Sequence, residues 1–123
     1  MSQFSVSFRQ HNGVDILELR GELDAHTASE LEAAFERLLQ EGRCRVVINC
    51  AELSYISSAG LGVFMAYVEE MRSRGGDIKF CHMSPKIYNI FDLLGFPLLY
   101  DILPTETEAI ARFSSHAQTS QSE

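Results

Sequence analysis

The chain opens with apolar and polar residues in strict alternation. The segment from Phe4 to Phe8 has this period of two, which is typical of a half-buried strand. Asn12-Gly13 follows as a two-residue turn, because both residue types tolerate the positive φ that a tight hairpin needs. The segment from Val14 to Arg20 predicts the returning strand, so the chain is expected to begin with an antiparallel hairpin.

Beyond the hairpin, apolar residues recur every three or four positions in three segments, and each predicts an amphipathic helix. The apolar stripes are Leu31, Ala34, Phe35, Leu38 and Leu39; then Leu61, Phe64, Met65, Val68 and Met71; then Ile87, Ile90, Phe91 and Leu94. Thr27 and Glu30 have the spacing of a capping box, which predicts the start of the first helix. Ser84-Pro85 is typical of the start of the third helix.

Short apolar runs separate these helices and predict strands. Arg45–Cys50 and Asp77–Cys81 are expected inside a sheet, and Leu98–Ile102 is expected as a short last strand. Thr105 and Glu108 then predict a fourth helix by another capping box. The alternation of strand and helix predicts an α/β fold, with a mixed sheet of four to five strands that is largely parallel beyond its antiparallel hairpin. One domain is expected over residues 1–113, followed by a disordered polar tail over 114–123.

Charge and composition narrow the functional classes. The chain of 123 residues carries a net charge of −7, which argues against a nucleic acid partner. No apolar run approaches the roughly 20 residues that cross a bilayer, and Met1–Ser5 lacks the features of a signal peptide, so we expect a cytoplasmic protein without membrane insertion. The cysteines Cys44, Cys50 and Cys81 lack metal-ligand spacing and are expected to be buried free thiols, with no metal and no cofactor.

The segment from Tyr55 to Gly62 is the most unusual in the chain. It lies between a buried strand and the second helix, where open α/β sheets meet their ligands and partners. Ser57 is suited to the N-cap, which places Ser58 in the bare first turn of this helix. Gly60 and Gly62 each cost about 1 kcal/mol in a helix relative to alanine. They indicate either that another surface approaches closely or that the helix packs tightly on its own sheet.

A hydroxyl in the first turn of a helix is well placed to carry a phosphate. The free backbone N–H groups and the positive end of the helix would stabilise the added charge, so a phosphate on Ser58 would leave the fold intact and change the surface. The alternative is that Ser57 and Ser58 only cap the helix. Spacing alone does not decide between these interpretations.

Three segments together resemble the STAS-domain family of bacterial anti-sigma factor antagonists. They are Leu53–Gly62, with the sequence Leu-Ser-Tyr-Ile-Ser-Ser-Ala-Gly-Leu-Gly; Gly21–Ala28, which resembles the loop after the second strand of that family; and Ser84–Gly95, which resembles its third helix. The similarity extends from about Phe4 to Phe113 in the order and spacing of the family. The resemblance implies a single STAS domain.

The resemblance also implies a function. In that family the unphosphorylated antagonist binds an anti-sigma factor, which is also a serine kinase, and so releases a sigma factor; a metal-dependent serine phosphatase reverses the phosphorylation. The motif places the phosphoacceptor at Ser58, with Ser57 as a rival because it stands where many members have Asp. The implied partner-binding residues are Glu22, Asp24, His26, Ser57, Ser58, Ala59, Gly60, Leu61 and Gly62.

Other functions remain open from the sequence. A STAS domain can also be a constitutive subunit of a lipid-transport or stress-signalling assembly, without a phosphate cycle. An enzyme is the least favoured interpretation: Glu22 and Asp24 could form a catalytic pair, but the resemblance places them in a loop for partner contact. Met65 and Met71 are expected in the core rather than in a binding surface.

Overall fold

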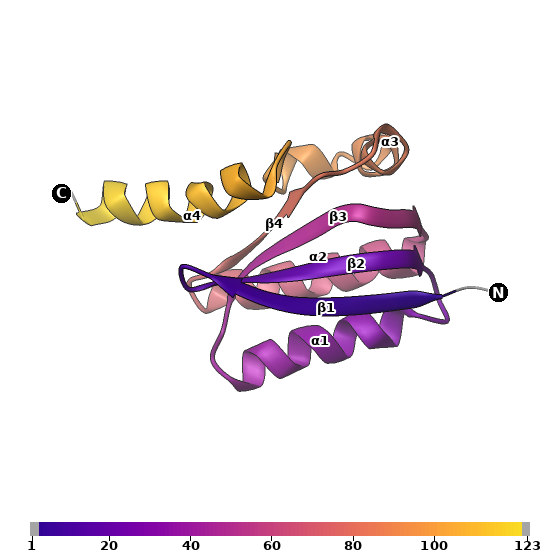
Figure 1. The fold of residues 1–123 in the computed structure, drawn as a ribbon, viewed down its shortest axis with the longest axis horizontal. Helices are drawn as coiled ribbons and strands as arrows, with labels where there is room; N and C mark the ends of the chain where they lie inside the picture. Colours follow the sequence, from indigo (N-terminus) through magenta and orange to yellow (C-terminus); the bar gives the residue numbers. More distant parts are fainter. Residues whose placement is uncertain (1–2, 122–123) are drawn as a thin grey trace.

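The computed structural model describes the backbone of residues 3–121 and the side chains of residues 3–113 (Figure 1). Within this part of the chain, five strands alternate with helices much as the sequence predicts. The elements are β1 (Phe4–His11), β2 (Val14–Leu23), α1 (Ala28–Gln40), β3 (Arg45–Ile56), α2 (Ser58–Ser73), β4 (Asp77–Cys81), α3 (Pro85–Leu93), the short 3₁₀ helix η1 (Phe96–Leu98), β5 (Ile102–Leu103) and α4 (Glu106–Gln121).

The strands form one mixed sheet in the order β1-β2-β3-β4-β5. β1 and β2 pair antiparallel, and every other neighbouring pair is parallel, which confirms the predicted fold class. The hairpin turn has Asn12 at φ 54° and Gly13 at φ 78°, the left-handed conformation that this pair of residues was expected to adopt. The carboxyl ends of β2 and β3 therefore lie side by side at one end of the sheet.

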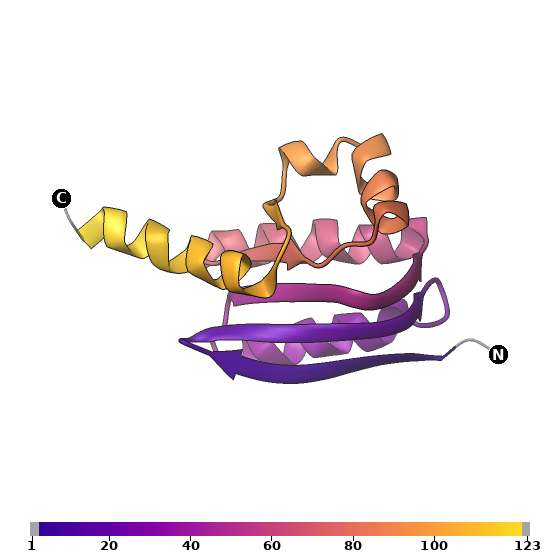
Figure 2. The same ribbon diagram turned by 45° about the horizontal axis from the view of Figure 1, so that its top comes forward.

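The helices cover the two faces of the sheet unequally (Figures 1 and 2). α1, α2 and α3 pack on one face and bury the larger core, in which the ring centroids of Phe64 and Phe80 are 5.0 Å apart. α4 packs on the other face, where Ala109 and Ile110 cover a smaller cluster around Ile16 and Val47. β2 alternates between these cores, because Ile16 points to one face and Leu17 to the other.

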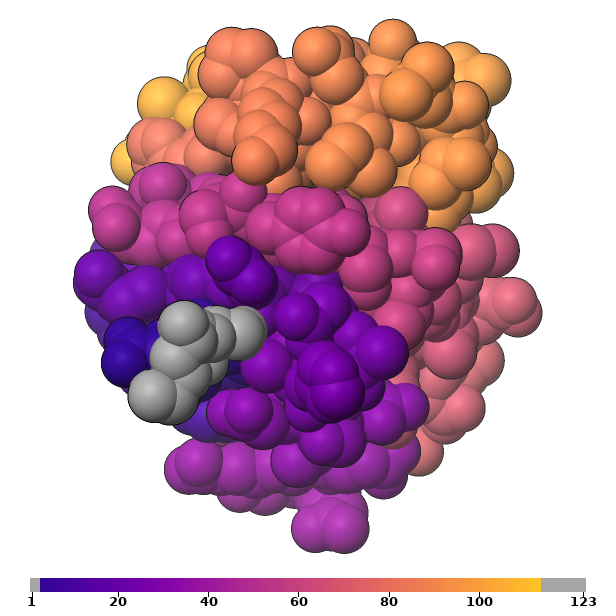
Figure 3. Space-filling model, turned by 90° about the vertical axis from the view of Figure 1, so that its right-hand side faces the viewer, coloured from indigo at the N-terminus to yellow at the C-terminus, as the bar shows by residue number. Residues whose placement is uncertain are grey.

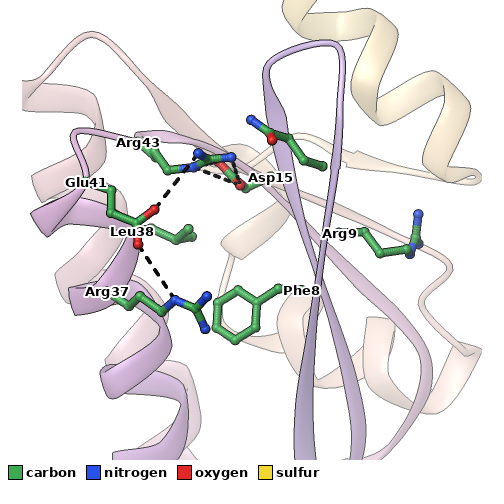
Figure 4. Close-up of a pocket in the computed structure, with 8 residues that line it drawn as sticks. Phe8, Arg9, Asp15, Arg37, Leu38, Glu41 and Arg43 are labelled. Carbon is green, nitrogen blue, oxygen red and sulfur yellow. Dashed lines mark hydrogen bonds and ion pairs between the residues drawn. The ribbon is translucent and has the colours of Figure 1, made fainter.

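A partly buried ion pair fixes the connection from α1 to β3 (Figure 4). Asp15, at the start of β2, is buried, and Arg43 donates to both of its carboxylate oxygens at 2.7–3.1 Å. These hydrogen bonds raise the pKa of Arg43 above its ordinary value. Gly42 ends the preceding helix at φ 73°, so the chain can turn back toward β2 and bring the guanidinium over the carboxylate.

The prediction for the last strand was wrong in position. β5 consists of Ile102 and Leu103, whereas Leu98 belongs to η1 and is 91% exposed. Gly95 turns the chain at φ 74° and Pro97 fits the start of η1, so Leu98 and Leu99 lie on an exposed turn, while Tyr100 is buried. Leu94, which the sequence placed in the apolar stripe of α3, is exposed as well.

α4 extends past the boundary predicted at residue 113. Its N-cap is the one expected, because the N–H of Glu108 donates to the hydroxyl of Thr105 at 3.2 Å. The helix then runs to Gln121, while residues 122 and 123 of the expected tail lie outside the described residues. A disordered tail over 114–123 stays a prediction of the sequence.

Candidate functional site

The loop from β2 to α1 is closed by a reciprocal pair of hydrogen bonds between Asp24 and Thr27. The N–H of Asp24 donates to Thr27 Oγ1 at 2.9 Å, and the N–H of Thr27 donates to Asp24 Oδ1 at 3.2 Å. This is a capping box placed one turn earlier than the predicted box of Thr27 and Glu30, which was wrong. Thr27 does not cap α1 with its side chain: its hydroxyl accepts from the N–H of Asp24 and donates to the carbonyl of Glu22 at 2.9 Å.

This loop is joined to the start of α2 by the sheet. Leu23 pairs with Ile56 in register, and the N–H of Ser57 donates to the carbonyl of Leu23 at 2.9 Å. The two predicted site segments, which are separate in sequence, therefore meet at the carboxyl end of the sheet. Figure 3 views the molecule from this end, where the purple segment of the loop and the magenta segment that enters α2 lie against each other.

The first turn of α2 has the geometry that the sequence predicts. Ser57 is the N-cap, with the extended dihedrals φ −101° and ψ 175°, and α2 begins at Ser58. The first intrahelical bond runs from the N–H of Leu61 to the carbonyl of Ser57 at 3.0 Å. The N–H groups of Ser58, Ala59 and Gly60 therefore precede the helical hydrogen-bond ladder and have no partner within it.

The two serines at this helix start differ in accessibility. The Oγ atom of Ser57 is buried and has no hydrogen-bond partner among the described residues, so it does not cap the helix with its side chain. Ser58, one residue later, is exposed. The hydroxyl that a second protein can reach is the one at Ser58.

The two glycines of this segment, Gly60 and Gly62, face opposite sides of the helix. A Cβ atom at Gly60 would lie 2.7 Å from Cγ of Leu23 and 3.0 Å from Cγ1 of Ile56, so the helix packs here against its own sheet. A Cβ at Gly62 would have no atom within 4 Å. Tight packing on the sheet, one of the two explanations that the sequence left open, is confirmed at Gly60. Gly62 leaves the outer surface bare, and the close approach of another surface there stays a prediction.

Two exposed apolar side chains, one just before α2 and one two turns into it, were missed from the sequence. Met65 is 49% exposed, which corrects the prediction that it lies in the core, while Met71 is fully buried as expected. Tyr55, just before the helix, is 42% exposed. Met65 lies seven residues after Ser58. This spacing of two helical turns could have predicted that Ser58 and Met65 lie on one face of the helix.

Of the remaining predicted partner residues, some are exposed, and others are hydrogen-bonded or packed within the domain. Glu22 and His26 are exposed beside the helix start. Asp24 is partly buried, and its carboxylate accepts hydrogen bonds from the N–H groups of His26 and Thr27, so it holds the loop in shape. Leu61 is buried and supports the helix from inside.

The fold and this arrangement agree with the comparison to protein families. Residues 5–109 match the model of the STAS domain, a span that includes both site segments. The chain belongs to the STAS family. This result confirms the resemblance seen in the sequence.

Named relatives of this STAS domain are regulatory proteins. The anti-sigma F factor antagonist of Paenibacillus polymyxa is 27% identical over 106 residues, which cover 85% of this chain and 91% of the relative. The anti-sigma-B factor antagonist of Staphylococcus epidermidis is 32% identical over 85 residues, which cover 69% of this chain and 79% of the relative. The structure of the Bacillus cell fate determinant SpoIIAA in its phosphorylated form superposes with a TM-score of 0.69 and 24% identity, covering 90% of this chain and 99% of that one.

Two of the three cysteine thiols of this STAS domain are buried in the sheet. Burial raises the pKa of the Cys81 thiol to about 12, and that of Cys50 above its ordinary range, so both stay protonated. Cys50 and Cys81 are buried free thiols as expected, whereas Cys44 is partly exposed. Within residues 3–113, no three His, Cys, Asp or Glu side chains gather into a metal-binding group. Among the described helices, none has the length and apolar character to cross a membrane.

Proposed function

We propose that this protein is an anti-sigma factor antagonist controlled by phosphorylation of Ser58. In its unphosphorylated form it binds an anti-sigma factor that is also a serine kinase, and it thereby releases a sigma factor in the cytoplasm. Phosphate on Ser58 stops this binding, and a metal-dependent serine phosphatase restores it. Membership of the STAS family and the names of the antagonist relatives support the general function.

The observation that carries this proposal is the exposure of Ser58 in the first turn of α2. A kinase must surround the accepting hydroxyl, and Ser58 is exposed whereas the Oγ of its rival Ser57 is buried. This difference favours Ser58 as the acceptor. In SpoIIAA, the same fold has been solved in a phosphorylated form.

Electrostatics accounts for the switch without a change of fold. A phosphoserine adds about −1.5 to −2 charges, and the open N–H groups at the start of α2 favour an anion there. Shifting a complex from nearly full to nearly empty takes about 5.5 kcal/mol. Two unit charges at ~4 Å contribute about 4 kcal/mol at an effective dielectric of ~20. A dianion that meets one carboxylate of the partner, with some steric exclusion, therefore suffices.

The surface around Ser58 is suited to close docking. Ser58, Gly62 and Met65 lie along one exposed stripe of α2, and the absence of side-chain bulk at Gly62 allows a partner backbone to approach. Tyr55, three residues before Ser58, and Met65, two helical turns after it, offer exposed apolar area, and such residues are enriched in protein interfaces. Glu22 and His26 border the stripe and add polar contacts.

The test is to capture the partner with the unmodified protein and then to add ATP to the recovered complex. We expect the protein to be released with phosphate on Ser58, as read by mass spectrometry. Ser58→Ala should stay bound after ATP, and Ser58→Asp should bind at least 100-fold more weakly. Ser57→Ala is the matched control and should still be phosphorylated and released.

Other outcomes would contradict the proposal. Phosphate on Ser57 would move the acceptor, and equal affinity of Ser58→Ala and Ser58→Asp would show that charge at this position does not control binding. A stable complex that never transfers phosphate would favour the alternative, in which the domain is a constitutive subunit of a lipid-transport or stress-signalling assembly.

A further inference from the structure

The outer edge of β1 carries backbone groups that no described residue uses. The N–H of Glu22 donates to the carbonyl of Gln3 at 3.2 Å, and the register pairs Phe4 with Gly21 and His11 with Val14. Hydrogen-bonded pairs alternate in an antiparallel ladder, so the odd-numbered residues of β1 bond to β2. The even-numbered residues direct their N–H and C=O groups away from the sheet. They are Phe4, Val6, Phe8 and Gln10.

β1 lacks the features that usually protect an edge strand from pairing. It is eight residues long, has neither proline nor glycine, and pairs with β2 without a register shift. Its one Lys or Arg side chain, Arg9, is bound over the sheet face by Glu18 and Glu106 at 2.5 and 2.6 Å, so it does not guard the edge. The opposite edge strand, β5, is only two residues long. In Figure 2, β1 forms the rim of the sheet, with no element beyond it.

An exposed aromatic ring marks the same edge. Phe8 is 38% exposed, and its inner side is covered by the guanidinium of Arg37, which lies 4.4 Å from the ring centroid (Figure 4). Val6 and Phe4 lie on the same face of β1 and are partly buried against the larger core. The edge therefore combines unpaired backbone N–H and C=O groups with a row of apolar side chains, Phe4, Val6 and Phe8, that is only partly covered by the rest of the chain.

We propose that β1 is a dimerisation strand that pairs antiparallel with β1 of a second copy about a twofold axis at Ser7. In this register Val6 lies opposite Phe8 of the second copy, and Phe4 lies opposite Gln10. Ser5 lies opposite Arg9, so no like charges face each other across the strands. A register centred on Arg9 would place the two arginines against each other and is disfavoured.

The self-complementarity of β1 is what points to a second copy as the occupant. In the reversed strand every outward backbone pair would meet its counterpart, and Val6 and Phe8 of each copy would form two apolar cross-strand pairs, while Phe4 would lie opposite Gln10. The two sheets would then become one continuous ten-strand sheet, from two sheets of five strands. Because the strands of the two copies run in opposite directions, their carboxyl ends and the two Ser58 surfaces would face apart and stay uncovered. The inference is independent of the proposed function.

Hydrogen exchange of the natural protein tests the pairing directly. Amides of Val6, Phe8 and Gln10 should become protected as protein concentration rises, whereas those of Ser5 and Ser7 should be protected at every concentration. In parallel, sedimentation equilibrium should show the mass rising from 13.8 kDa toward twice that value, more readily at high salt because the chain is acidic. A constant 13.8 kDa at millimolar concentration would overturn the proposal.

Paired substitutions identify the surface and the register. Phe8→Lys should abolish the dimer, whereas Leu98→Lys, at a more exposed apolar residue of η1, should leave it unchanged. Under mild oxidation Ser7→Cys should form a disulfide-linked dimer, since residues facing each other at such an axis have Cα atoms about 4.5 Å apart. Ser5→Cys, whose copies would be about 13 Å apart, should not. Loss of the dimer with Leu98→Lys alone, or cross-linking through position 5 rather than 7, would refute the β1 interface.

Discussion

The inner side of the first turn of α2 packs tightly against the sheet, whereas the outer side is exposed. On the inner side, a Cβ at Gly60 would collide with Leu23 and Ile56, and the N–H of Ser57 donates to the carbonyl of Leu23. On the outer side, Ser58 and Gly62 are exposed, and a Cβ at Gly62 would meet no atom within 4 Å. A single turn of helix is therefore anchored by one face and open on the other.

Under the proposed function, this difference would let a modification of one residue change binding without changing the fold. A group attached outside, at Ser58, meets solvent and the backbone N–H groups of the helix start. The contacts that hold the helix in place lie on the side away from it. Residues on the inner side of this turn should therefore affect the unfolding free energy, and residues on the outer side should affect partner binding.

The largest effect on stability is expected for Gly60→Ala. The new methyl group would lie 2.7 Å from Cγ of Leu23, a fully buried side chain, so the helix start must shift outward. Overpacking of this kind costs about 1–3 kcal/mol, which exceeds the gain in helix propensity. Urea unfolding measures the loss of unfolding free energy.

Gly62→Ala is the matched control for that experiment. Nothing lies within 4 Å of the added Cβ, so the unfolding free energy should rise by up to ~1 kcal/mol while binding to the partner weakens. If both alanine variants were equally stable, the distinction between the two sides of the helix would fail.

Asp24→Ala should lower the unfolding free energy by about 1–2 kcal/mol, because the N–H groups of His26 and Thr27 lose their acceptor. Thermal unfolding with circular dichroism provides the measurement. Asp24→Asn keeps an acceptor oxygen and should retain most of the stability, and it reports on whether the charge contributes to docking. Glu22→Ala, at an exposed side chain, should leave stability unchanged; a loss there equal to that of Asp24→Ala would contradict the assignment.

Ser57→Ala should have the smallest effect. Truncating an N-cap serine usually costs about 1 kcal/mol, but this hydroxyl is buried and makes no hydrogen bond. The unfolding free energy should stay the same or rise by up to ~1 kcal/mol, because an unsatisfied buried group is removed. Ser84→Ala is the comparison: the Ser84 hydroxyl accepts from the N–H of Ile87 at 3.2 Å, so its loss should cost about 1 kcal/mol. Equal losses for both variants would mean that Ser57 caps its helix after all.

Much of the fold and of the site follows from local sequence patterns. The hairpin, the interior strands and the amphipathic helices are each encoded by a period and a turn residue, and the structure confirms them. The position of Ser58 at the first turn of α2 follows from the N-cap preference of Ser57. The small residues around it predicted a bare surface, which the structure shows at Gly62.

The errors arise where two local patterns compete and tertiary contacts decide. Asp24 and Thr27, and Thr27 and Glu30, are both plausible capping pairs; the first forms because β2 pairs with β3 as far as Leu23, so the turn begins at Asp24. Met65 lies at the margin of an apolar stripe, and only the position of the neighbouring elements shows that this margin is exposed. The run from Leu98 to Ile102 is apolar without being buried throughout, which periodicity alone cannot reveal.

The exposed position of Ser58 on a narrow helical turn has a consequence for timing. In the proposed cycle, the partner and the enzymes that add or remove the phosphate all need access to this hydroxyl. A partner bound over Ser58 would therefore shield it from those enzymes until the complex dissociates. The dissociation rate of the complex at this site would therefore limit the rate at which phosphate is added to or removed from Ser58.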